Sequence, residues 1–216
     1  MTATSTTEAQ QIFRVAYENR YTWNDNFPGY QAHLELRQGD EVDHAQVKVN
    51  ADLTVEVSEI EDEKVKESIY NQMRDIVTHR KRKSFDQAHG KNNFYLGEKD
   101  ATGAVEIKVE GDSMGSNYKV RGNEISQVSR VMGPIAFTIN TAETLDTGEG
   151  YIATKYNAIF RDPKTDELKE KREFEEEYAN LGGYYIPTRQ AVEAIAKDGN
   201  TTTTEFKFSQ IELLDS

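Results

Sequence analysis

The chain contains no cysteine among its 216 residues. This absence excludes disulfide bonds, thiolate metal sites and thiol nucleophiles. Positive charge is also scarce, since 26 Lys and Arg stand against 38 Asp and Glu, which gives a net charge of −12. Because every phosphate contact needs a nearby cation, this balance argues against a nucleic-acid partner and against anionic membrane surfaces.

Long hydrophobic runs are missing as well. No stretch approaches the roughly 18 apolar residues of a membrane-spanning helix, so we expect no integral membrane segment. Residues 1–8 show neither the basic nor the apolar region of a secretory signal, and we therefore expect a cytoplasmic protein. Hydrophobic residues make up only 36% of the chain, but aromatic residues reach 10%, which indicates a folded domain with a lean core.

Two segments have apolar residues at the spacing of a helix. The first predicts a helix over about residues 7–21. The second predicts a long helix over about residues 59–80, behind a capping box formed by Ser58 and Glu61. The apolar stripe of this long helix consists of Val65, Ile69, Met73 and Ile76. We expect residues 1–6 to be a disordered N-terminus and residues 7–216 to form a single domain.

Most of the remaining sequence alternates apolar and polar residues with a period of two, which is typical of half-buried strands. Three such strands separate the two helices, and seven or eight follow the long helix. Residues 167–181 fit either a helix or a strand, and we prefer a strand because Gly182 and Gly183 then turn directly into the next one. A sheet of this size must curl.

The predicted fold class is therefore α+β and mostly antiparallel β. We expect a curled half-open barrel of about ten strands, with an N-terminal helix and one long helix on the concave side.

One motif is typical of hydrolases. Residues 111–115 match G-x-S-x-G, the nucleophile elbow that presents a serine between a strand and a helix. Here a strand follows, and no histidine occurs after His89. A glycine-rich hairpin explains the motif better, and an esterase-like hydrolase that depends on Ser113 is kept only as an alternative.

Metal and acid–base chemistry have little support. His33 and His44 lie on adjacent predicted strands, but no histidine pair has metal-ligand spacing. The acidic run around Glu173 and Glu177 is explained by a solvated sheet face, because neighbouring solvated glutamates do not acquire the separated pKa values that a catalytic pair needs. We expect no metal, no cofactor and no catalytic residue.

Aromatic residues gather in two parts of the sequence, and they line either the cavity for an apolar ligand or a plug at one end of the sheet. Together with two residues of the long helix, the candidate ligand-binding set is Tyr17, Tyr21, Trp23, Phe27, Tyr30, Met73, Ile76, Tyr184 and Tyr185.

The single strong positive patch can dock a protein partner, although capping of the helix C-terminus explains it equally well. It consists of Arg80, Lys81, Arg82 and Lys83.

Several strings resemble an uncharacterised family of cyanobacteria and plastid-bearing organisms, a DUF3386-like domain of unknown function. They are residues 16–23, 27–30, 76–80, 87–92, 115–118, 131–134 and 182–189. The resemblance covers nearly the whole chain and implies a photosynthetic source and a single-domain protein, but it brings no catalytic residues.

The order of helices and strands more weakly resembles the periplasmic lipoprotein and lipid carriers of the outer-membrane localisation type. That resemblance implies an unclosed barrel with an apolar cavity. The favoured function is thus a non-enzymatic protein that binds a lipid or other apolar small molecule in a half-barrel cavity. The alternative is an assembly or scaffold factor for a photosynthetic complex, and the oligomeric state stays open.

Overall fold

The computed structural model describes residues 3–111 and 116–215. The helices in these ranges are α1 (Ala3–Glu18), α2 (Glu63–Arg80) and α3 (Phe85–His89). The strands are β1 (Gly29–Gln38), β2 (Glu41–Asn50), β3 (Val55–Ser58), β4 (Asn93–Lys99), β5 (Val105–Glu110), β6 (Ser116–Arg121), β7 (Glu124–Met132), β8 (Ile135–Asp146), β9 (Tyr151–Arg161), β10 (Leu168–Leu181), β11 (Tyr184–Ala196) and β12 (Thr201–Leu213). None of the helices described is long and apolar enough to cross a membrane.

The strands form one sheet in the order β3-β2-β1-β12-β11-β10-β9-β8-β7-β6-β5-β4. The pairs from β4 to β9 are antiparallel, as are those joining β12, β1, β2 and β3. Since β3 and β4 stand at the two ends of this order, the sheet is not closed. The prediction of a mostly antiparallel open sheet is confirmed. The count of about ten strands is wrong, because the described chain has twelve and each alternating segment after α2 forms its own strand.

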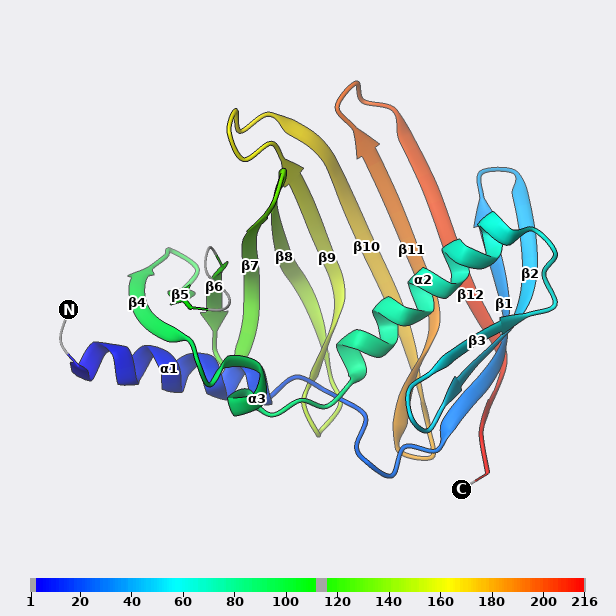
Figure 1. Cartoon of the computed structure of the whole chain (residues 1–216), viewed down its shortest axis with the longest axis horizontal. Coiled ribbons are helices and arrows are strands. Elements are labelled where there is room, and N and C mark those ends of the chain that lie inside the picture. The colour runs from blue at the N-terminus through cyan, green and yellow to red at the C-terminus, as the bar shows by residue number, and fades with distance from the viewer. Residues whose placement is uncertain (1–2, 112–115, 216) are drawn as a thin grey trace. The chain divides into compact units, whose positions relative to one another are not determined.

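The chain divides into two compact units. The first unit consists of residues 1–21, 83–173 and 194–200, and the second of residues 22–82, 174–193 and 201–216. The first unit therefore contains α1, α3 and β4 to β9, whereas the second contains α2, β1 to β3 and β12. Figure 1 shows α1 beside β4 to β7 in the first unit, and α2 across β10 to β12 and β1 in the second.

In the first unit, α1 packs on the sheet through aromatic side chains. Phe13 is fully buried, and its ring centroid lies 4.4 Å from that of Tyr118 and 5.1 Å from that of His89. Burial lowers the pKa of His89 to about 4, and nearby cations contribute to the same shift. His89 is therefore neutral at pH 7 and acts there as an aromatic core residue.

The helices differ from the prediction in two starting positions and in one additional short helix. The first helix begins at Ala3, before the predicted start near residue 7. The long helix is capped by Asp62, whose Oδ1 accepts the N–H groups of Lys64 and Val65, because Ser58 still pairs with β2. The short helix α3 was not predicted, although its first residues form a capping box with Ser84.

The ambiguous segment forms strand β10, which confirms the preference for a strand. Gly182, at a φ of 57°, opens the turn into β11. Alternate side chains of β10 point to opposite faces of the sheet: Tyr178 bonds to Arg80 of α2, whereas Glu177 pairs with Arg189 on the other face.

Candidate ligand-binding site

Helix α2 presents an apolar stripe in the second unit. Its buried residues are Ile69, Met73, Ile76, Val77 and Arg80. They recur every three or four positions and therefore lie on one side of the helix. The strands of the same unit contribute buried apolar side chains, among them Leu34, Leu36, Val47, Val49, Ile186, Phe206 and Phe208. Burial of each large side chain stabilises this layer by roughly 1.5–3 kcal/mol, so α2 is held mainly by the hydrophobic effect.

A groove of about 490 Å³ lies between α2 and the edge strand β3. Its lining combines apolar groups with a charged rim: Val55, Val57, Glu63, Lys66, Glu67 and Tyr70. Lys66 and Tyr70 are each three residues before a buried member of the stripe, Ile69 and Met73 respectively. The groove therefore lies beside the N-terminal half of the apolar stripe, and the Tyr70 side chain there is exposed.

A chain of hydrogen bonds ties α2 to β10 and β11. Arg80 Nη2 donates to Tyr178 Oη at 2.8 Å, and Tyr178 Oη in turn donates to Glu176 Oε2. Gln190 Nε2 donates to Glu176 Oε1 at 2.6 Å, and Gln72 Nε2 donates to Gln190 Oε1. We call these five residues the polar chain. It anchors the helix at two positions and connects the Arg80 cation to the Glu176 carboxylate through one phenol.

Two buried polar atoms at this place have no hydrogen-bond partner among the described residues, Tyr30 Oη and Arg80 Nε. Tyr30 is fully buried, and burial raises the pKa of its hydroxyl, with a further contribution from Tyr178. Burial also raises the pKa of Tyr178, against the lowering effect of Arg80. Both phenols therefore keep their protons at neutral pH and remain able to donate hydrogen bonds.

Further aromatic residues close the end of this layer near the hairpin between β10 and β11. The rings of Trp23 and Phe27 stack with centroids 4.1 Å apart, and the Phe27 ring lies 5.2 Å from that of Tyr184. Trp23 Nε1 donates to the carbonyl of Tyr185 at 3.2 Å. The Trp23 N–H donates to the carbonyl of Arg80 at 2.8 Å, so these rings also fix the C-terminal end of α2.

Two of the predicted ligand-binding residues belong to the first unit instead. Tyr17 packs edge-on against His89, with ring centroids 4.8 Å apart. The N–H of Tyr21 donates to the carbonyl of Tyr151 at 2.9 Å. The aromatic residues that cluster in the sequence are thus divided between the two units, and none of the nine predicted residues lines the groove beside β3.

The basic run does not behave as one patch. Arg80 is buried, with an exposed fraction of 9%, and its guanidinium belongs to the polar chain. Lys81, Arg82 and Lys83 are exposed. Only Lys81, Arg82 and Lys83 therefore remain accessible for the predicted docking of a protein partner.

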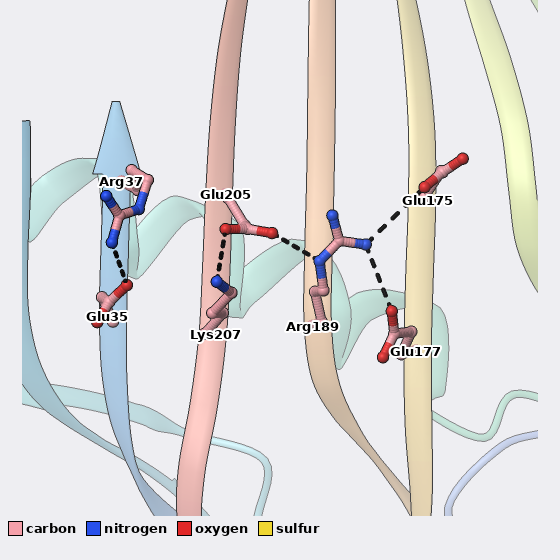
Figure 2. A network of polar contacts seen from close by, with 7 residues as sticks. All are labelled: Glu35, Arg37, Glu175, Glu177, Arg189, Glu205 and Lys207. Atoms are coloured by element: carbon pink, nitrogen blue, oxygen red, sulfur yellow. Dashed lines mark hydrogen bonds and ion pairs between the residues drawn. The ribbon is translucent and has the colours of Figure 1, made fainter. Parts of the chain in front are cut away.

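The opposite face of the second unit's sheet carries a network of ion pairs, shown in Figure 2. Arg189 Nε lies 2.6 Å from Glu205 Oε1, and Arg189 Nη1 lies 3.4 Å from Glu177 and 3.8 Å from Glu175. Lys207 Nζ contacts the other oxygen of Glu205 at 3.0 Å. Glu175 and Glu177 thus belong to the predicted charged face, whereas Glu176 bonds to Tyr178 and Gln190 in the polar chain.

The remaining chemical candidates do not form a site in the described structure. Ser113 lies outside the described residues. His33 is paired with Gln46 and His44 with Glu35, so the two histidines are not opposite each other. Within residues 3–111 and 116–215, no group of three or more His, Asp or Glu side chains is arranged to hold a metal ion.

Residues 4–214 match the sequence profile described as protein of unknown function (DUF3386). The chain belongs to the DUF3386 family. This match confirms the family resemblance inferred from the sequence.

The solved structures that are similar to this DUF3386 chain include the following two. One is a LolA superfamily protein from Nitrosomonas europaea, with 11% identity and a TM-score of 0.25 over 96% of this chain and 94% of that one. The other is a DUF1329 family protein from Desulfovibrio piger ATCC 29098, with 8% identity and a TM-score of 0.26 over 97% of this chain and 93% of that one. Both TM-scores are low, so neither structure informs what the DUF3386 chain binds. No curated protein sequence matches it.

The sequence analysis missed most of the polar chain of this DUF3386 member. Glu176 was grouped with its acidic neighbours on a solvated sheet face, and Tyr178 was not considered as a partner for it. The available signal was parity: both residues are even-numbered in a strand, and the period of two puts them on the same face. Gln72 and Gln190 gave no signal, since isolated glutamines are normally solvated.

Proposed function

We propose that this chain binds an apolar small molecule along the stripe of α2 in the second unit, without catalysing a reaction. The observation that carries the proposal is the groove of about 490 Å³ at the start of that stripe. Ligand pockets typically have volumes of roughly 300–1,000 Å³ and combine apolar walls with a few polar groups. The groove with Val55, Val57 and Tyr70, followed by the buried stripe and the polar chain, has this composition.

The length of the stripe suits an elongated ligand. Lys66 borders the groove and Arg80 ends the helix, and the 14 residue steps between them correspond to about 21 Å at a rise of 1.5 Å per residue. Met73 lies in its middle, and methionine adapts its shape readily because its side chain is unbranched and flexible. An apolar ligand that enters at the groove would therefore lie parallel to α2, and Met73 and its buried neighbours would move aside to make room for it.

The test is a fluorescence titration with diphenylhexatriene, a hydrocarbon probe that brightens in apolar surroundings. The wild-type protein should bind it saturably. Tyr70→Lys places a charge in the groove and should weaken binding at least tenfold. Asn71→Lys is the matched control, because it adds the same side chain to an exposed neighbouring position of α2 and should leave the affinity unchanged.

Two results would contradict the proposal. The first is a wild-type protein that gives no saturable signal. The second is an equal loss of affinity in both lysine variants, which would mean that the probe responds to net charge and not to the groove. Far-UV circular dichroism of each variant shows that the fold is retained.

A further inference from the structure

Two buried hydrogen-bond donors beside Tyr178, at the C-terminal end of the α2 stripe, have no acceptor among the described residues. Tyr30 Oη is completely buried, and Arg80 Nε is buried in a side chain of 9% exposed fraction. More than about 90% of buried polar groups in proteins have a hydrogen-bond partner, so two unsatisfied donors at one place require an explanation. Leaving such a group unpaired is unfavourable, and an acceptor that reaches it gains the bond.

The surrounding charges restrict what that acceptor can be. Arg80 is the cation of the polar chain, and its Nη2 bonds to Tyr178, which bonds to the carboxylate of Glu176. The positive charge is therefore already balanced by one negative charge through a single phenol. A second negative charge brought into this buried place would lie close to Glu176 and would not be compensated.

Resting on the proposed function, we infer that the ligand carries an uncharged carbonyl oxygen, as in an ester or a ketone, which accepts hydrogen bonds from Tyr30 Oη and Arg80 Nε. The carbonyl group lies at the C-terminal end of the stripe, and the apolar body extends along α2 toward the groove. An ionised carboxylate of the same length is disfavoured, because it adds a charge beside Glu176. A pure hydrocarbon binds but leaves both donors unsatisfied.

Three fluorescent probes separate these cases. Diphenylhexatriene has no polar atom, the methyl ester of cis-parinaric acid has an uncharged carbonyl, and cis-parinaric acid at pH 8 has an ionised carboxylate. The wild-type protein should bind the ester about tenfold more tightly than the acid. A factor of ten corresponds to 1.4 kcal/mol, which is the size expected for one buried hydrogen bond.

The variant Tyr30→Phe removes only the hydroxyl. It should weaken ester binding about tenfold and leave diphenylhexatriene binding unchanged. Tyr95→Phe is the matched control, because it removes a phenolic hydroxyl in the first unit, and it should change neither affinity. If Tyr30→Phe leaves ester affinity at the wild-type value, the donors are satisfied by water or by side-chain adjustment, and the inference is overturned.

A second variant tests the charge balance independently. Glu176→Gln removes the negative charge that disfavours the carboxylate, and the preference for ester over acid should fall from about tenfold to less than threefold. An unchanged preference would contradict the inference. The two possible failures can be distinguished. If the proposed function is wrong, no probe binds. If only this inference is wrong, diphenylhexatriene still binds equally to the wild-type protein and to Tyr30→Phe.

Discussion

Arg80 Nη2 donates a hydrogen bond of 2.8 Å to the hydroxyl of Tyr178, and this bond joins the last residue of α2 to the C-terminal part of β10. The same hydroxyl donates to Glu176, so the bond belongs to a connection between a buried cation and a carboxylate. The C-terminal end of the helix is therefore held by a specific polar contact in addition to its apolar packing.

Removal of this cation should destabilise the second unit. Arg80→Met retains an unbranched apolar side chain but leaves Glu176 without its cation, and we expect a loss of about 2–3 kcal/mol in the free energy of unfolding. Urea denaturation followed by the fluorescence of Trp23, the single tryptophan, measures this loss. Arg82→Met, two residues on and exposed, is the control and should change stability by less than about 0.5 kcal/mol. Equal effects in both variants would show that Arg80 has no special contact.

The hydroxyl of Tyr30 should destabilise the ligand-free protein. It is fully buried and has no hydrogen-bond partner in the part of the chain that the structure describes, and an unsatisfied buried donor costs about 1–3 kcal/mol. We therefore expect Tyr30→Phe to raise the free energy of unfolding by about 1 kcal/mol when no ligand is present. The same urea experiment detects the change. A loss of stability of this size would mean that the hydroxyl has a partner in solution.

The first unit should lose stability in mild acid because of His89. Burial, Arg20, Arg130 and Lys83 lower the pKa of this histidine from 6.5 to about 4. Between these values the unfolded chain binds a proton that the folded protein does not, so the stabilisation present above pH 6.5 is lost as the pH falls toward 4. The slope is at most about 1.4 kcal/mol per pH unit for one proton.

Two measurements check the prediction for His89. NMR titration of its ring protons should give a midpoint near pH 4. The midpoint of unfolding, followed by far-UV circular dichroism, should decrease as the pH is lowered from 6.5 to 4. His89→Leu removes the titrating group, and its stability should depend less on pH over the same range. A ring that titrates with its ordinary midpoint of 6.5 would contradict the burial.

The ion pairs around Arg189 should contribute less than the contact of Arg80, and they should depend on salt. This guanidinium is shared among Glu175, Glu177 and Glu205 on the face shown in Figure 2, and its side chain is 28% exposed. We expect Arg189→Gln to cost about 1 kcal/mol in dilute buffer, and less in 1 M NaCl, where screening acts over about 3 Å. Urea unfolding at the two salt concentrations measures both values. If the cost of Arg189→Gln does not change with salt, these pairs are not screened and the assignment to an exposed face is wrong.

Most of the sheet could be predicted from the sequence because its strands have strict alternation. Residues 167–181 were the difficult case, and the two-glycine turn that follows was enough to predict a strand there, which the structure has as β10. The cap of α2 was misplaced, because Ser58 and Asp62 are both good capping residues. Only the pairing of Ser58 with Gln46 in the sheet decides between them.

The site was less predictable, for physical reasons. The sequence shows that Trp23 and Tyr30 belong to one aromatic cluster, but it does not show which aromatic rings meet, and Tyr17 packs in the other unit. Arg80 was grouped with its exposed basic neighbours, since nothing local distinguishes a buried arginine from a solvated one. Its partner Tyr178 is 98 residues away, and only the folded chain brings the two together.

Native mass spectrometry of the protein isolated without added ligand from the organism that makes it, followed by organic extraction, examines directly whether the chain holds a ligand. We expect a complex with one apolar molecule per chain, and the extracted molecule should carry an uncharged carbonyl group. A bare polypeptide mass, together with no saturable binding of diphenylhexatriene, would contradict the proposed ligand binding and would leave the groove beside β3 as a surface feature without a ligand.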